Sequence, residues 1–160
     1  MNIVSNTGPL IALAKVDHLD LLNKLFGQVY IPTVVHRELL SKFGLEGVRL
    51  ERALNYFVII RPLAEIQPDV RVMTRYLDIG ERDAIALASE LNLPLVIDDR
   101  LGRLAAQRLN IPITGVVGVL IRAKLENLIP SLREILGQMR DKGYWLSDGL
   151  IAQALQLSGE

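Results

Sequence analysis

Short apolar runs alternate with longer segments of helical periodicity over the first two thirds of the chain. The runs are rich in β-branched and aromatic residues and lie at 2–5, 28–31, 56–60, 95–97 and 111–114. Each run has the length of a buried strand. Strands that alternate with helices are typical of βαβ units built around a mainly parallel sheet.

Helical spacing is clearest in three places. Residues 84–88 are apolar nearly all round, which predicts a helix buried on most sides. Leu101, Leu104, Ala105 and Leu109 recur on one face of a 3.6-residue period. After Thr114 the pattern becomes wholly helical, with expected helices at 116–127, 131–142 and 147–157.

These patterns predict an α/β fold, namely a three-layer α/β/α domain with a central parallel sheet of four or five strands. The 160 residues fit one domain, 1–160, in which the helices from about 116 form a C-terminal annex on the same core. No internal repeat is found that would indicate a solenoid.

Composition narrows the possible functions. Hydrophobic residues make up 50% of the chain and charged residues 22%, which predicts a folded core. Lysine plus arginine and aspartate plus glutamate both total 18, so no global positive field attracts nucleic acid. With no cysteine, disulfides and thiolate sites are excluded. No secretory leader or membrane span is recognised in the sequence, and the expected location is cytoplasmic.

Polar and acidic residues follow the expected strands, at the edge where parallel α/β sheets bind ligands. They are Asn6, Glu38, Glu81, Asp83, Asp98 and Asp99. Carboxylates that converge repel one another unless a cation neutralises them, and Mg²⁺ or Mn²⁺ is the natural choice for oxygen ligands. Each acid taken alone also fits a helix cap or an exposed helix position.

Four ordered motifs carry a resemblance that spans almost the whole chain. They lie at 5–14, 31–39, 80–88 and 95–100, and the match continues through 113–115 to the tail near 148. These segments resemble PIN-domain proteins, in particular a prokaryotic PIN-like branch related to VapC-type toxin ribonucleases. The resemblance implies phosphodiester hydrolysis of RNA with Mg²⁺ or Mn²⁺ as cofactor.

The resemblance also assigns roles to residues. It makes Glu38, Asp83 and Asp99 the metal-binding acids, with Glu81 and Asp98 as supporting residues. It gives Thr7 the task of orienting a ligand or water, and a capping hydroxyl is the alternative for this residue.

Asn6 departs from the pattern, because the family usually has an aspartate at this catalytic position. An asparagine offers a neutral carbonyl oxygen in place of a charge. Three hypotheses follow. The first is a divalent-metal ribonuclease that acts as the toxin of a toxin–antitoxin pair and forms homodimers. The second is a catalytically weakened PIN-fold module that binds RNA or a protein, and the third is a phosphoryl-transfer enzyme for small molecules.

Five basic residues without an intervening acid are the candidate RNA contacts. They are Arg100, Arg103, Arg108, Arg122 and Lys124. Solvated helix faces are the alternative explanation.

Other isolated residues carry less weight. His18 and His36 lack a partner at ligand spacing and predict no zinc site. Tyr144 and Trp145 fit core packing of the last helix, with an interface anchor as the alternative.

Overall fold

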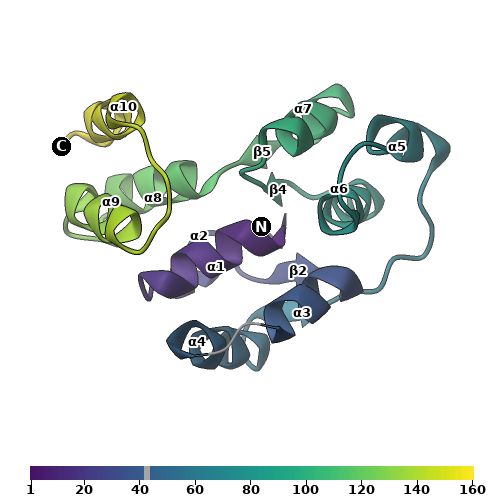
Figure 1. Cartoon of the computed structure of the whole chain (residues 1–160), viewed down its shortest axis with the longest axis horizontal. Helices are drawn as coiled ribbons and strands as arrows, with labels where there is room; N and C mark the ends of the chain where they lie inside the picture. Colours follow the sequence, from purple (N-terminus) through teal and green to yellow (C-terminus); the bar gives the residue numbers. More distant parts are fainter. Residues whose placement is uncertain (42–43) are drawn as a thin grey trace.

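The computed structural model describes residues 1–41 and 44–160. Within them, five parallel strands form one sheet in the order β3-β2-β1-β4-β5, with helices on both sides (Figure 1). The strands are β1 (Ile3–Ser5), β2 (Val29–Ile31), β3 (Val58–Ile60), β4 (Leu95–Val96) and β5 (Ile113–Thr114). The three-layer parallel fold expected from the sequence is confirmed, with five strands in the sheet.

Strand β1 lies at the middle of the sheet. Val4 is in register with Tyr30 of β2 on one side and with Leu95 of β4 on the other. The chain runs outward from β1 to β3 in one direction and from β4 to β5 in the other. The strand order therefore reverses between β1 and β4, and such a switch point is where open α/β sheets bind ligands.

Ten helices surround the sheet in the described part of the chain. They are α1 (Thr7–Lys15), α2 (Asp20–Phe26), α3 (Thr33–Leu40), α4 (Leu45–Leu54), α5 (Pro68–Met73), α6 (Ile79–Leu91), α7 (Arg100–Arg108), α8 (Val116–Leu125), α9 (Leu132–Asp141) and α10 (Asp148–Ser158). Adjacent strand residues point to opposite faces, so Ile3 belongs to one hydrophobic cluster and Val4 to the other.

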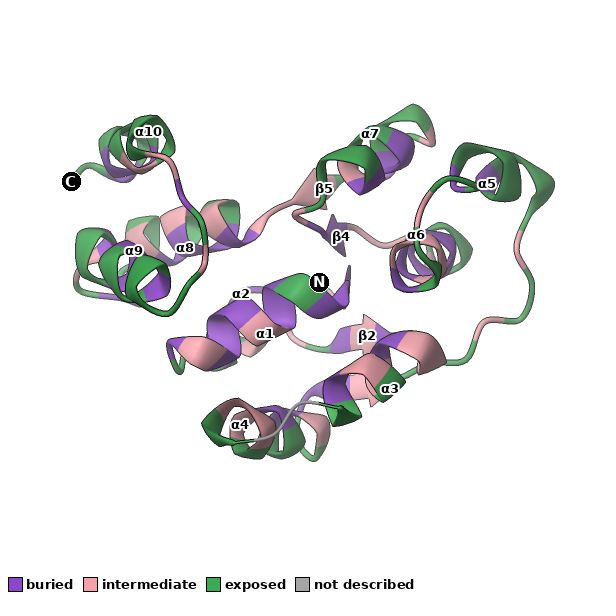
Figure 2. Cartoon of the chain, in the orientation of Figure 1, coloured by how far each residue is buried: buried purple, intermediate pink, exposed green. Residues whose placement is uncertain are grey.

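The second cluster is built around α6, as the sequence predicts. Residues 84–88 of this helix are all buried, between the sheet and its neighbours α5 and α7 (Figure 2). Asp78 caps the helix by accepting a hydrogen bond from the backbone amide of Glu81. This cap fixes the first turn of α6 at the carboxyl edge of the sheet.

The C-terminal annex packs on the first cluster. Leu120 of α8, Leu132 of α9 and Leu155 of α10 lie in the same apolar cluster as residues of α1 and α2. Ser131 and Ser147 cap α9 and α10 with their side-chain oxygens. The three helices match the segments expected from the sequence to within a few residues.

The packing of α7 differs from the pattern of its leucines, and one packing expectation, for Trp145, was wrong. In α7 the buried residues are Gly102, Ala105 and Ala106, whereas Leu101 and Leu104 are 59% and 40% exposed. Small residues let α7 approach the sheet closely, so the buried face is rotated from the one that the leucines indicate. Trp145 is 83% exposed instead of packing in the core, and only its neighbour Tyr144 is partly buried.

None of the helices in the ranges 1–41 and 44–160 combines the length and the apolar character needed to cross a membrane.

Candidate active site

Glu38 is held at the junction of three helices. Helix α1 begins at Thr7, whose Oγ1 donates a hydrogen bond to Oε2 of Glu38 at 2.5 Å. Glu38 lies in α3, which packs against α6. A Cβ atom at Gly80, in the first turn of α6, would collide with the Glu38 carboxylate. Gly80 therefore makes room for this carboxylate, and Thr7 orients it.

Negative charge concentrates around Glu81 in the same turn of α6. Partial burial, with the charges of Asp78 and Asp99 nearby, raises the pKa of Glu81 to about 7. Asp99 comes from the segment after β4, so residues distant in sequence meet here, and Asp78, Glu81 and Asp99 together form the acidic group of the site. Asp99 also caps α7, because its Oδ2 accepts a hydrogen bond from the amide of Gly102 at 2.7 Å.

Asn6 occupies the centre of the sheet edge. It directly follows β1, is 8% exposed, and its backbone amide donates to the carbonyl of Val96 in β4 at 3.0 Å. It is also the residue before Thr7, which contacts Glu38. Asn6 is thus next to the residue whose side chain binds the Glu38 carboxylate, and its own backbone amide binds β4, the strand that leads to Asp99.

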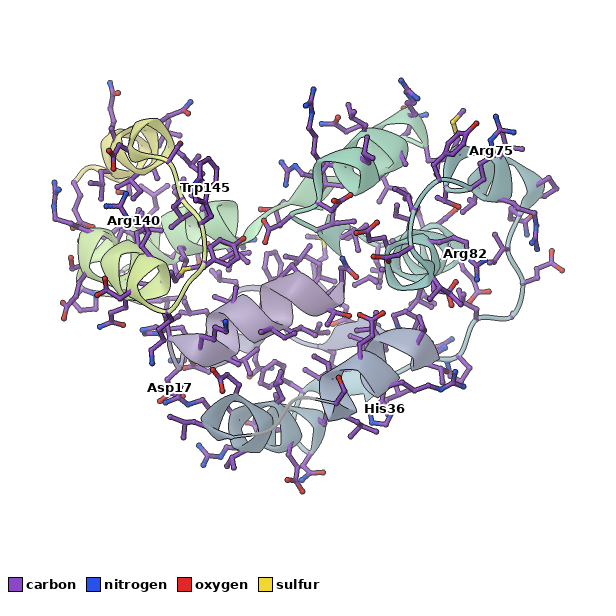
Figure 3. The ribbon with its side chains drawn as sticks, in the orientation of Figure 1. Asp17, His36, Arg75, Arg82, Arg140 and Trp145 are labelled. Atoms are coloured by element: carbon purple, nitrogen blue, oxygen red, sulfur yellow. The ribbon has the colours of Figure 1, made fainter. Side chains whose placement is uncertain are left out.

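Asp83 has a cationic partner beside it. Its Oδ1 lies 2.9 Å from Nη2 of Arg82 and accepts a hydrogen bond from Nε of the same side chain at 3.0 Å. The Asp83 side chain is 14% exposed, and Figure 3 shows Arg82 on α6. Arg82 offsets the charge of Asp83, and metal binding by this residue stays a prediction.

Asp98 has different hydrogen-bond partners from Asp99. Its Oδ2 accepts a hydrogen bond from the hydroxyl of Tyr144 at 2.8 Å, and its Oδ1 accepts one from the amide of Val116 at 3.0 Å. Burial and the Asp98 charge raise the pKa of Tyr144 above its ordinary value. Asp98 therefore connects β4 to α8 and to the annex, and its role beside a metal stays a prediction.

The five basic candidates lie in two regions. Arg100, Arg103 and Arg108 are on α7, and Arg103 donates to the carbonyl of Ile97 at 2.9 Å. Arg122 and Lys124 lie near the end of α8. Arg122 forms an ion pair with Glu126 and lies over the Phe26 ring, and Lys124 forms an ion pair with Glu160. Only the α7 group starts next to Asp99, and RNA contact by all five stays a prediction.

Two residues of the site were missed from the sequence. Asp78 is the cap of α6 and part of the acidic group, and the spacing Asp78-x-x-Glu81 before an apolar run is a capping signal that would have found it. Gly80 matters for the space that it leaves beside Glu38. No local sequence signal indicates such a contact between two helices.

The donor set suits a hard divalent cation. In the described residues, no three histidine, aspartate or glutamate side chains form a group that could hold a metal ion. Mg²⁺, however, is usually bound by one or two carboxylates and keeps several waters. Partial burial and the charges of Asp78 and Asp99 disfavour ionisation of Glu81, and a cation beside it would offset both effects. Carboxylate and amide oxygens are the donors that Mg²⁺ and Mn²⁺ prefer, and a metal site formed by these residues stays a prediction.

The fold and the acidic edge define an open parallel α/β domain with carboxylates at its switch point. The family model described as "DUF3368: PIN domain" matches residues 2–160, and the chain belongs to this PIN-domain family. PIN domains are in general nucleases that depend on divalent metals, and they commonly bind RNA.

A solved structure has the same fold. It is a PilT N-terminus domain protein from the hyperthermophilic archaeon Sulfolobus solfataricus P2, 24% identical to this chain, with a TM-score of 0.56. The match covers 77% of this chain and 93% of the archaeal one. A search of curated proteins finds no match.

Proposed function

We propose that this PIN domain is a ribonuclease that hydrolyses phosphodiester bonds with the help of Mg²⁺ or Mn²⁺. The observation that carries the proposal is the acidic group at the switch point, where partial burial and the charges of Asp78 and Asp99 raise the pKa of Glu81 to about 7. A carboxyl that titrates near neutral pH is suited to exchange protons with a reacting group. Perturbed acids of this kind are typical of functional sites.

The chain's own residues have distinct tasks in this proposal. Glu38, Asp83 and Asp99 hold the cation, and Thr7 keeps the Glu38 carboxylate in place through its hydrogen bond. Glu81 exchanges a proton near the reacting phosphate. When bound, the metal supplies stabilisation of the charge that develops on the phosphate oxygens.

Asn6 supports a second candidate, a weakened PIN-fold module that binds RNA or a protein. Its buried amide lies where the family usually has a carboxylate, which lowers the charge available to a cation. The lack of a preformed three-acid group in the described residues also favours this candidate. An amide oxygen remains a ligand for hard cations, so we retain the ribonuclease as the first candidate.

The cellular role belongs to the proposal as well. We propose a cytoplasmic toxin that is restrained by an antitoxin protein and that acts as a homodimer. This part rests on the family resemblance alone. Induced expression of the chain should arrest growth, and expression of Asp99→Asn should not. Growth under both conditions would remove the toxin role and leave the nuclease proposal standing.

Cleavage of single-stranded and structured RNA tests the nuclease directly. We expect the wild type to cut RNA with Mn²⁺ or Mg²⁺ and to stop when EDTA is added. Asp99→Asn should lose cleavage, and Asn6→Asp should increase it. If only Asn6→Asp cuts, the native protein is the weakened module. If neither protein cuts with any divalent metal, the catalytic proposal is wrong.

A further inference from the structure

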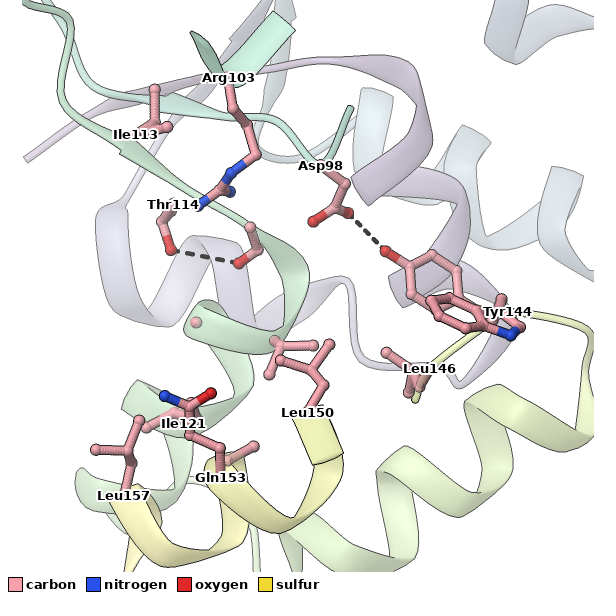
Figure 4. Close-up of a pocket in the computed structure, with 15 residues that line it drawn as sticks. Asp98, Arg103, Ile113, Thr114, Ile121, Tyr144, Leu146, Leu150, Gln153 and Leu157 are labelled. Carbon is pink, nitrogen blue, oxygen red and sulfur yellow. Dashed lines mark hydrogen bonds between the residues drawn. The ribbon is translucent and has the colours of Figure 1, made fainter. Parts of the chain in front are cut away.

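A cavity lies beside Asp98, the residue that precedes Asp99 of the acidic group. Its volume is about 510 Å³, within the usual range of small-ligand pockets. It opens between β5, α8, α10 and the segment that carries Tyr144 and Trp145 (Figure 4). Asp98 lines this cavity, whereas the next residue, Asp99, acts on Glu81. The cavity and the acidic group are therefore connected through two adjacent residues, one of which belongs to each.

The walls of the cavity differ from one another in chemistry. Ile121, Leu150 and Leu157 are among the aliphatic residues that line the cavity, and Gln153 of α10 places an amide beside Ile121 and Leu157 (Figure 4). Trp145 also lines the cavity, and it is 83% exposed. An exposed tryptophan beside an apolar wall offers a flat stacking surface to a ligand.

The polar end of the cavity carries no net charge. Asp98 and Arg103 both line it, and their charges are opposite. Asp98 offsets the attraction of Arg103 for a phosphate, so the cavity offers an anion no net attraction. A flat, neutral group with hydrogen-bonding edges suits the combination of tryptophan, aliphatic wall and amide.

We propose that this cavity binds a segment of single-stranded RNA, with one base stacked on Trp145 and neighbouring nucleotides reaching Gln153 and Arg103, which lie at two other sides of the cavity (Figure 4). The inference rests on the proposed nuclease function, because it places a nucleotide of the substrate beside the acidic group. Unstacked bases of single-stranded RNA bind aromatic side chains and are read through their edges. The base chosen by this cavity contributes to where the strand is cut.

Intrinsic fluorescence reports on this site directly. Trp145 is the single tryptophan of the chain, so a base that stacks on it quenches the whole tryptophan signal. Adenosine, uridine and a short single-stranded oligoribonucleotide are titrated in EDTA, which removes any contribution from metal and cleavage. We expect saturable quenching, strongest with the oligoribonucleotide. No quenching by any of these probes overturns the proposal.

Matched variants separate the cavity from other RNA contacts, with anisotropy of a labelled oligoribonucleotide as the readout. Trp145→Ala should weaken binding at least about tenfold, whereas Trp145→Phe should retain most of it. Gln153→Leu should weaken binding, and Gln156→Leu should not, because Gln156 lies on the same helix outside this cavity.

The outcomes distinguish this inference from the nuclease proposal. Quenching without metal-dependent cleavage supports the base site and counts against catalysis. Full RNA binding by Trp145→Ala, in a protein that still cleaves, overturns the base site and leaves the nuclease in place. The exposed tryptophan and aliphatic wall would then be better explained by a partner protein.

Discussion

The hydroxyl of Tyr144 donates a hydrogen bond to Oδ2 of Asp98 at 2.8 Å, which ties the C-terminal annex to the end of β4. The bond joins residues 46 positions apart in the sequence. It also explains why two adjacent aspartates have different surroundings. Asp98 faces Tyr144 and α8, while Asp99 caps α7 beside Glu81.

Tyr144→Phe tests what this bond contributes to stability. The substitution keeps the ring and removes the donor, so the partly buried Asp98 loses a hydrogen bond to its charge. We expect the free energy of unfolding to fall by about 1.5 kcal/mol in urea denaturation. The matched control is Tyr56→Phe at an 80% exposed ring, which should change little. Equal effects of the two substitutions would contradict the account.

Glu81 makes the stability of the fold depend on pH. The pKa of this carboxyl is about 7 in the fold against an ordinary 4.5, so the folded state binds its proton more tightly than the unfolded state does. The contribution of Glu81 therefore favours folding below pH 4.5 and is lost as the pH rises through about 7.

Glu81→Gln should remove this dependence. The variant is expected to gain stability over the wild type at pH 8 and to lose that advantage at pH 5, measured by urea denaturation at both values. Glu51→Gln, at an exposed position of α4, is the control and should leave the difference between the two pH values unchanged. A wild-type profile identical to that of Glu81→Gln would show that Glu81 has no raised pKa.

Thr7 is expected to act through Glu38. Thr7→Val keeps the shape of the side chain and removes the donor to the Glu38 carboxylate, whereas Thr7→Ser keeps the hydroxyl. We expect Thr7→Val to lower kcat for RNA cleavage about tenfold and Thr7→Ser to restore most of it. If both variants lose activity equally, or neither does, the hydroxyl does not orient Glu38.

Gly80→Ala tests the space beside Glu38. An alanine Cβ would collide with the Glu38 carboxylate, so we expect weaker metal binding and slower cleavage. The control is Gly137→Ala in α9, where a Cβ meets nothing within 4 Å. This control should stabilise the protein by about 1 kcal/mol, because alanine is a better helix former than glycine. Unchanged metal affinity in Gly80→Ala would contradict the placement of Glu38.

The strands and most helices could be predicted from the sequence because apolar runs and helical periodicity are local signals. The buried face of α7 could not, since Gly102 packs against the sheet while Leu101 is exposed. The sequence places acids at the strand ends, but it does not say which way each one faces. Asp98 and Asp99 diverge because the fold brings Tyr144 to one of them and Glu81 to the other.

A calorimetric titration of Mg²⁺ and Mn²⁺ tests the central claim most directly, namely that the acids at the switch point form a cation site. We expect the wild type to bind metal with release of protons near pH 6, because Glu81 must ionise beside the cation. Asp99→Asn should lose binding, and Asn6→Asp should tighten it by adding a charged ligand. Absence of metal binding in all three proteins would contradict the site and leave only the fold.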